Sequence, residues 1–137
     1  MSLTQIFETA GSGMNAQSLR LNTTASNIAN AEAAHSSTDQ VYRGRHPVFS
    51  TYYNSALQGR EAVGVKVQGI VESQAPLQQR YEPHHPKADE DGYVFYPNVN
   101  VVEEMTNMIS ASRSFQVNVE VMNSAKQMMQ RVLSLGQ

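Results

Sequence analysis

The residues best suited to metal or acid–base chemistry lie together in one short polar stretch. His84 and His85 are adjacent, and Asp89 and Asp91 follow closely. Because imidazole and carboxylate groups suit several divalent ions, this stretch allows a metal site and, with it, a small metal-dependent hydrolase. Adjacent histidines point in different directions, however, and the nearby prolines and acidic residues are typical of an exposed turn. We therefore favour the turn and predict no metal or cofactor site.

Other patterns that carry chemistry are missing from the sequence. Residues 89–92 do not fit a calcium loop, because the glycine should be the sixth residue counted from Asp89, where Val94 stands. No Gly-x-Ser-x-Gly or Gly-x-Gly-x-x-Gly motif occurs, and zero cysteines leave no thiol nucleophile. Glu103 and Glu104 could serve as general acids, but helix capping explains both. The sequence therefore favours a protein that is not an enzyme.

Composition excludes several other classes. The chain has 137 residues and a formal net charge of -2, so it lacks the basic surface that nucleic-acid binding needs. No apolar run reaches the ~18 residues that span a bilayer, and no cleaved secretory signal opens the chain. Hydrophobic residues make up 40% and aromatic residues 7%, with no tryptophan. With so few large apolar side chains, we expect the chain to bury part of its apolar surface against other chains.

Proline divides the sequence into three segments. All five prolines lie between His46 and Asn98. We therefore expect an N-terminal helical segment (1–35), a loop-rich and β-hairpin-rich middle segment (36–100) and a C-terminal helical segment (101–137).

The N-terminal segment has the pattern of an amphipathic helix. Ser2 and Gln5 have capping-box spacing, and a stripe with spacings of four and three follows. Gly11 and Gly13 each cost roughly 1 kcal/mol relative to alanine, so this helix needs a packing partner. Its stripe comprises Leu3, Phe7, Ala10, Met14, Gln17, Leu21, Thr24, Ile28 and Ala31.

The C-terminal segment has the pattern of a stronger helix. Asn100 and Glu103 have capping-box spacing, and Gly136 is placed to end the helix. Its methionines either fill the core or form a surface that can pack against several different neighbours. We place Phe115 in the middle of the packed stripe and Asn118 on the opposite side. The stripe comprises Val101, Met105, Met108, Ser112, Phe115, Val119, Met122, Lys126, Met129 and Leu133.

The middle segment alternates short strands with turns. Residues 63–71 show a period of two, which predicts a strand, and 47–53, 77–81 and 93–96 are weaker candidates. Residues 33–40 are polar and unpatterned, which predicts a loop. The expected fold is mainly α, an elongated α+β chain whose long terminal helices pair as a coiled coil beside a small β-rich middle.

Residues 24–31 resemble a signature of the flagellar axial proteins. A small-Asn-apolar-Ala-Asn run closes the first helix in that family, and here its core is Ser26, Asn27, Ile28, Ala29 and Asn30. One departure is that Val41 stands where the family pattern has a glycine, within a longer loop. Further matches to the C-type family of proximal-rod proteins of the flagellar basal body occur at 16–18, 20–22, 72–76, 81–83, 91–94, 97–99, 102–105 and 110–114.

The resemblance implies a structural rod subunit. Rod proteins form the periplasm-crossing drive shaft of the bacterial flagellum and leave the cytoplasm by the flagellar type III system without a cleaved signal. The implied partners are copies of the chain itself, other proximal and distal rod proteins, and the export-gate adapter at the rod base. There is no implied nucleic acid, membrane span or small-molecule substrate. We predict that the subunit-packing residues are Leu3, Phe7, Met14, Leu21, Ile28, Met105, Met108, Phe115, Val119, Met122, Met129 and Leu133.

A second alternative stays open beside the hydrolase. A stand-alone helical adaptor could bind a partner helix through the same two stripes, although this would leave the proline-rich middle segment without a role.

Overall fold

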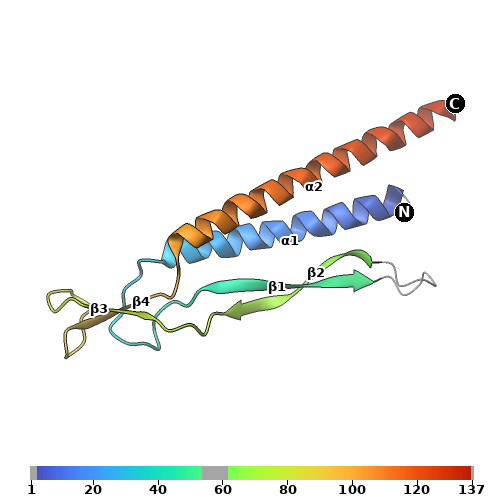
Figure 1. Cartoon of the computed structure of the whole chain (residues 1–137). Helices are drawn as coiled ribbons and strands as arrows, with labels where there is room; N and C mark the ends of the chain where they lie inside the picture. Colours follow the sequence, from blue (N-terminus) through green and yellow to red (C-terminus); the bar gives the residue numbers. More distant parts are fainter. Residues whose placement is uncertain (1–2, 54–61, 137) are drawn as a thin grey trace. The chain divides into compact units, whose positions relative to one another are not determined.

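The computed structural model describes residues 3–53 and 62–136. A long helix α1 (Leu3–Asn30) is followed by strands β1 (Arg45–Tyr53), β2 (Ala62–Glu72), β3 (Gln78–Tyr81) and β4 (Tyr93–Tyr96), and the second long helix α2 (Val101–Leu135) ends the chain (Figure 1). The predicted class, two terminal helices with a small β-rich middle, is confirmed. All four predicted strands are present within a few residues of their expected bounds.

The chain divides into two compact units, each built from parts of both helices. Unit 1 comprises Met1–Leu21, Pro47–Gly69 and Ile109–Gln137, and unit 2 comprises Asn22–His46 and Ile70–Met108. Neither unit corresponds to one of the three predicted segments, so the role of those segments in assembly stays a prediction.

Local hydrogen bonds set the ends of the helices. Asn100 accepts from the amides of Val102 at 3.1 Å and Glu103 at 3.4 Å, so it caps α2 as its spacing predicts. Gly136 follows the last residue of α2, also as predicted. At the end of α1, Asn30 Nδ2 donates to the carbonyl of Ser26 at 2.8 Å. The other predicted capping box involves Ser2, which lies outside the described residues.

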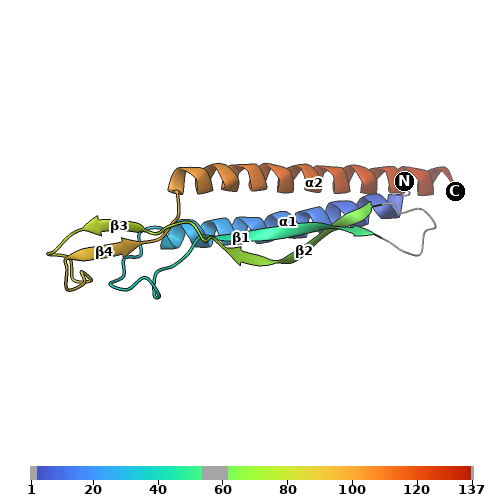
Figure 2. The ribbon, with the colours of Figure 1, turned by 60° about the horizontal axis from the view of Figure 1, so that its bottom comes forward.

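In unit 1, small residues of α1 let two elements approach its opposite faces. A methyl group at Gly13 would lie 2.8 Å from Asn118 Nδ2, and one at Gly11 would lie 3.7 Å from Met122 Cε, so α2 covers this face (Figure 2). Asn118 therefore faces α1, and the prediction that it lies on the opposite side of the helix is wrong. The physical reason is that Gly13 has no side chain and so leaves room for the polar side chain of Asn118. A prediction based on large apolar residues does not anticipate such a contact.

The β1–β2 sheet approaches the other face of α1 through Ser12. The Ser12 hydroxyl donates to the Thr9 carbonyl at 2.9 Å and accepts from the Val65 amide at 3.1 Å. A side chain at Gly64 would collide with this hydroxyl, so β2 needs glycine there. The packing partner that α1 requires is thus supplied within the chain, by α2 on one face and β2 on the other.

Unit 2 has a small core around the β3–β4 pair. These strands are antiparallel, with Gln78 opposite Tyr96 and Tyr81 opposite Tyr93. Val94 and Tyr96 pack with Ala34, which belongs to the stretch predicted as a loop. That stretch also forms an isolated bridge to β4, between His35 and Phe95. Burial, and next the hydrogen bond to Glu82, raise the pKa of Tyr96 above its ordinary value of 10.0.

The stretch between β3 and β4 is a hydrogen-bonded turn built around Asp89. Its Oδ1 accepts from the amides of Asp91 at 3.0 Å and Tyr93 at 2.7 Å. Nδ1 of His85 accepts from the Lys87 amide at 3.0 Å. Gly92 has a φ of +83°, which favours glycine. Two of the four groups suspected of binding a metal, the side chains of His85 and Asp89, therefore shape the turn.

Candidate assembly site: the Asn27 network and the helix faces

Asn27 of the family signature is the centre of a buried polar network in unit 2. Its side chain is 0% exposed, although an amide so placed must find partners for both its oxygen and its nitrogen. Oδ1 accepts from the Arg45 amide at 2.9 Å and the Tyr42 hydroxyl at 2.7 Å. Nδ2 donates to the Arg45 carbonyl at 2.8 Å and to Glu104 Oε2 at 3.0 Å. One side chain thus joins α1, the start of β1 and the first turn of α2.

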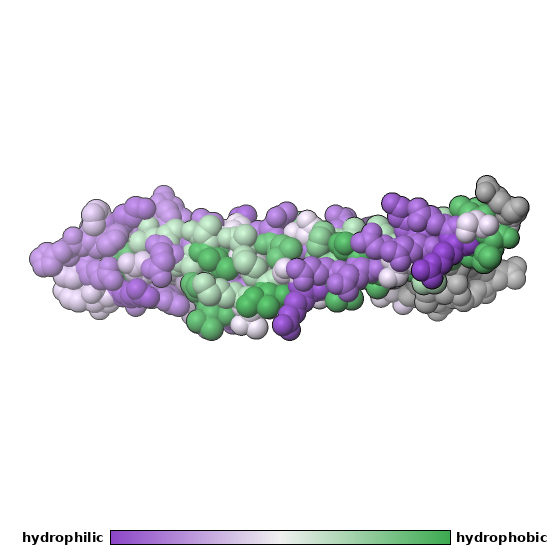
Figure 3. Space-filling view, turned by 90° about the horizontal axis from the view of Figure 1, so that it is seen from above, coloured by the Kyte–Doolittle hydropathy of each residue, from purple (hydrophilic) through white to green (hydrophobic). Residues whose placement is uncertain are grey.

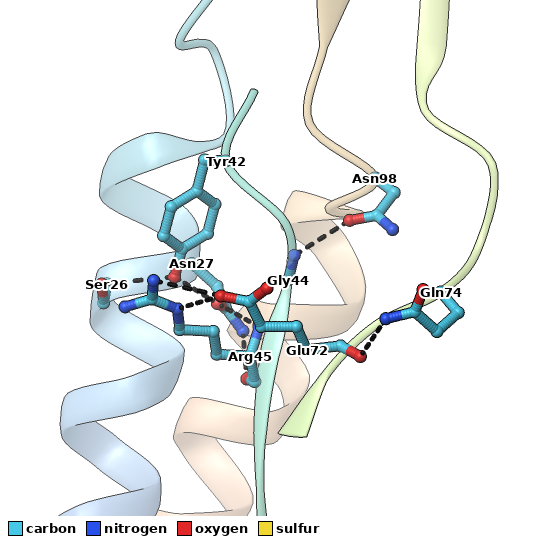
Figure 4. A network of polar contacts seen from close by, with 8 residues as sticks. All are labelled: Ser26, Asn27, Tyr42, Gly44, Arg45, Glu72, Gln74 and Asn98. Carbon is cyan, nitrogen blue, oxygen red and sulfur yellow. Dashed lines mark hydrogen bonds and ion pairs between the residues drawn. The ribbon is translucent and has the colours of Figure 1, made fainter. Parts of the chain in front are cut away.

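The two bonds to Arg45 imitate the pairing of a neighbouring strand. Asn27 bonds both the N–H and the C=O of that residue, as an adjacent strand does in an antiparallel ladder. The backbone at the start of β1 is therefore satisfied on this side by a helix side chain (Figure 4). An alanine at this position would leave the backbone groups of Arg45 without these partners, which gives Asn27 a structural role that a smaller side chain cannot fill.

A second group of bonds ties β1 to the chain entering α2. The Gly44 amide donates to Asn98 Oδ1 at 2.9 Å, and Asn98 Nδ2 donates to the carbonyls of Ser73 at 3.2 Å and Ala75 at 2.9 Å. The Arg45–Glu72 ion pair at 3.2 Å lies beside it, with both side chains about half exposed (Figure 4). Since exposed ion pairs contribute little, the hydrogen bonds of the half-buried Asn98 carry most of the stabilisation here.

The signature residues serve different purposes. Ser26 Oγ lies 3.3 Å from the Tyr42 hydroxyl, and Asn30 closes the last turn of α1. Ile28 is half-buried, and Ala29 is exposed. The network therefore accounts for Ser26, Asn27 and Asn30, whereas Ala29 is available for contacts outside the chain.

Sequence reasoning missed several members of this network. It attributed Glu104 to capping and to the helix dipole, but the side chain is 4% exposed and is bonded by Asn27, so that explanation is incomplete. Tyr42 matches the tyrosine of the family pattern, but the sequence does not show that it bonds Asn27, because the two residues lie 15 positions apart. Arg45 carried no signal of its own, because its partner lies 18 residues away. Val41, noted as a departure from the family pattern, is buried.

The predicted packing residues of α1 are all half-buried in the chain. The most buried positions are smaller neighbours, such as Ala10 and Ala16, each 3% exposed. The half-buried set comprises Leu3, Phe7, Met14, Leu21 and Ile28.

The predicted packing residues of α2 divide into two groups. Met105 and Leu133 are exposed, while Glu104, Ala111 and Ala125 are the buried positions. The side of α2 that is covered within the chain is therefore shifted from the predicted stripe toward small residues. Contacts between subunits at the predicted positions stay a prediction. The half-buried members are Met108, Phe115, Val119, Met122 and Met129.

The remaining apolar side chains of α2 form an exposed face. Figure 3 views the molecule from above and shows apolar patches among polar residues on this side. A contiguous exposed apolar patch is typical of a surface that binds another molecule. The members of this face are Val117, Val121, Met128, Val132 and Leu135, all within unit 1; Ile109 and Leu133 are also exposed but lie on other sides of the helix.

No group of three or more metal-ligating side chains occurs within residues 3–53 and 62–136. No helix in the described part of the chain is long and apolar enough to cross a membrane.

The chain combines two long terminal helices with an exposed apolar face on α2, and comparison with known proteins shows its family. A family model described as "Flagella basal body rod protein" matches residues 7–32, and one described as "Flagellar basal body rod FlgEFG protein C-terminal" matches residues 90–135. Over 137 residues, covering both chains fully, the flagellar basal-body rod protein FlgC of Salmonella typhimurium is 50% identical and that of Escherichia coli O6:H1 is 51% identical. The FlgC of Borreliella burgdorferi is 35% identical over 151 residues, with 99% of its length covered.

The chain belongs to the family of flagellar basal-body rod proteins of the FlgC type. It is a structural subunit of the proximal rod of the flagellar basal body, and it assembles there with other rod components.

Proposed function

We propose that the chain transmits torque along the rod by packing the exposed apolar face of α2 against helices of neighbouring subunits. The observation that carries this proposal is the exposure of that face. Val117 is 56% exposed, Val121 41% and Met128 52%. Burying apolar area yields about 25 cal/mol per Å², so covering such a face supplies a driving force for assembly.

The spacing of the exposed residues supports a helix-to-helix contact. Val117, Val121, Met128, Val132 and Leu135 follow one another at intervals of four, seven, four and three. This is the repeat of one face of an α-helix. Because torque must cross many such contacts in parallel, each contact needs only a modest strength.

The proposed partners are copies of this chain, other proximal and distal rod proteins and the export-gate adapter at the rod base. We propose a role without catalysis, small-molecule substrate or nucleic acid, and export through the flagellar type III system without a cleaved signal. The residues assigned to subunit packing include the exposed Met105 and Leu133, whose apolar side chains lack cover within the chain.

A complementation experiment tests the proposal. A strain lacking the gene should not swim, and the wild-type gene should restore swimming. Val121→Asp should be exported but should not restore rods, because it places a carboxylate in the face to be buried. Asn123→Asp is the matched control: Asn123 is also exposed and lies about 200° around the helix from Val121. Normal swimming without the gene, or equal behaviour of the two variants, would overturn the proposal.

A further inference from the structure

An open groove in unit 1 lies between α1 and the β1–β2 sheet. It encloses about 570 Å³, and its walls include Glu8, Ser12 and Asn15 of α1, Tyr52 of β1 and residues 64–67 of β2. This volume falls within the roughly 300–1,000 Å³ of sites that enclose a ligand, so several side chains of one partner fit into it. The groove faces away from α2, because α2 covers the opposite face of α1 (Figure 2).

Large apolar side chains continue from the groove onto the sheet. Tyr52 and Val65 line the groove and are both exposed. Val48, four residues before Tyr52 and on the same face of β1, is exposed as well. A two-stranded sheet without further cover is only marginally stable in water. This surface therefore favours a partner that is larger than a small molecule and extends beyond the groove along the sheet.

The groove also carries one charge of each sign. Glu8 lies on the wall made by α1 and Lys66 on the wall made by β2, and both side chains are exposed. The ion pair in the described part of the chain, Arg45–Glu72, involves neither of them. A partner that combines an apolar strip with a charge at its edge is therefore complementary to the groove.

The exposed apolar face of α2 has both of these properties. Val117 and Val121 belong to this face, and Glu120 lies about 100° around the helix from Val121, at the edge of the face. Glu120 is exposed and is the one acidic residue of the sequence after Glu104. When the apolar face lies in such a groove, Glu120 is therefore the group of α2 that can pair with Lys66.

We propose that this groove receives the exposed apolar face of α2 from a second copy of the chain, with Glu120 of that copy paired with Lys66. The inference rests on the proposed function and deepens it, because it names the surface that accepts the face of α2. The two surfaces are different patches of unit 1, so the contact is head-to-tail. Each added copy therefore presents one further groove or one further α2 face, and the contact can be repeated along an assembly.

Charge reversal tests the pairing of Lys66 with Glu120. Lys66→Glu and Glu120→Lys should each lower the amount of this chain in isolated basal bodies about tenfold, because each replaces a contact of opposite charges by one of like charges. Lys66→Glu combined with Glu120→Lys should restore the wild-type amount. Because both side chains are exposed, the purified single variants should unfold at the wild-type temperature. Gln130→Lys is the control: Gln130 is exposed, lies about 180° around α2 from Val121 and should assemble normally.

A disulfide trap identifies the occupant of the groove. The sequence contains no cysteine, so Lys66→Cys combined with Glu120→Cys introduces the only two thiols. Oxidation of isolated basal bodies should link copies of this double variant into dimers and longer ladders, whereas a bond within one chain leaves monomers. Either cysteine alone should give no ladder.

Each result decides the inference. Monomers alone after oxidation, or a double charge reversal that does not restore assembly, would overturn a second copy as the occupant. A lower unfolding temperature of either charge variant would show that the charge supports the fold itself, which would also overturn the proposal. Normal assembly of both single charge variants would overturn it while leaving the proposed function intact, provided that Val121→Asp still fails to build rods. If Val121→Asp builds rods as wild type does, the proposed function fails, and this inference fails with it.

Discussion

Replacing Asn27 by alanine should destabilise unit 2 more than any other single change in its polar network. The substitution removes four hydrogen bonds, to Tyr42, to Glu104 and to both backbone groups of Arg45. At about 0.5–1.5 kcal/mol each, these bonds sum to roughly 2–6 kcal/mol. Since a small domain is stable by only about 5–15 kcal/mol, we expect a loss of about 3–5 kcal/mol, a large share of the total.

The matched control is Asn30→Ala, three residues along the same helix. This substitution removes one described bond, to the carbonyl of Ser26, so we expect a loss of about 1 kcal/mol. Asn27→Asp is a sharper second variant: it keeps the size and an acceptor for Arg45 N–H, but it places an oxygen against Glu104 Oε2 and the Arg45 carbonyl. We expect it to be at least as damaging as alanine.

Two measurements decide the outcome. Urea unfolding followed by circular dichroism gives the change in free energy, and hydrogen exchange reports the Arg45 amide directly. Asn27→Ala should shift the urea midpoint well below that of Asn30→Ala, and it should speed exchange at Arg45. If the two variants unfold within about 0.5 kcal/mol of one another and Arg45 stays protected, the network does not hold β1 to α1.

Three further predictions concern the stripe, the turn and the core. Phe115→Asp should block rod completion, because it puts a charge at a half-buried position of α2, and an unaltered rod in electron micrographs would contradict this. His84→Ala combined with His85→Ala should leave swimming intact on soft agar, since the turn is organised by Asp89; loss of swimming with normal export would count against the turn. Because the pKa of Tyr96 is raised in the folded chain, its contribution to stability is present below pH 10.0 and is lost as the pH rises through the folded value. Tyr96→Phe should remove that part of the alkaline loss in urea titrations, and identical pH profiles would refute the assignment.

The elements could be predicted because their signals are local. The alternation of apolar residues in 63–71 and the Asn100 cap depend on neighbours in sequence, and both correspond to the observed β2 and the start of α2. The side of α2 that packs against α1 within the chain could not be predicted in full, for a physical reason. Apolar patterning favours large residues, whereas the closest approach of α1 and α2 uses Gly11 and Gly13 opposite Met122 and Asn118.

The candidate site could not be built from the sequence. Asn27 was singled out by its resemblance to a family signature, but its partners were not, because Glu104 lies 77 residues away along the chain. A side-chain amide that pairs with a strand backbone has no periodicity in sequence. The same holds for Ser12, whose hydroxyl accepts a hydrogen bond from the Val65 amide of β2, 53 residues away along the chain.

The most direct test of the central claim is a cryo-electron microscopic reconstruction of isolated basal bodies at side-chain resolution, with this chain traced in the rod. The account predicts that Val117, Val121 and Met128, which are exposed in the single chain, lie against helices of neighbouring subunits. If the chain is present in the rod but this face of α2 is open to solvent, the proposed route of torque between subunits is contradicted.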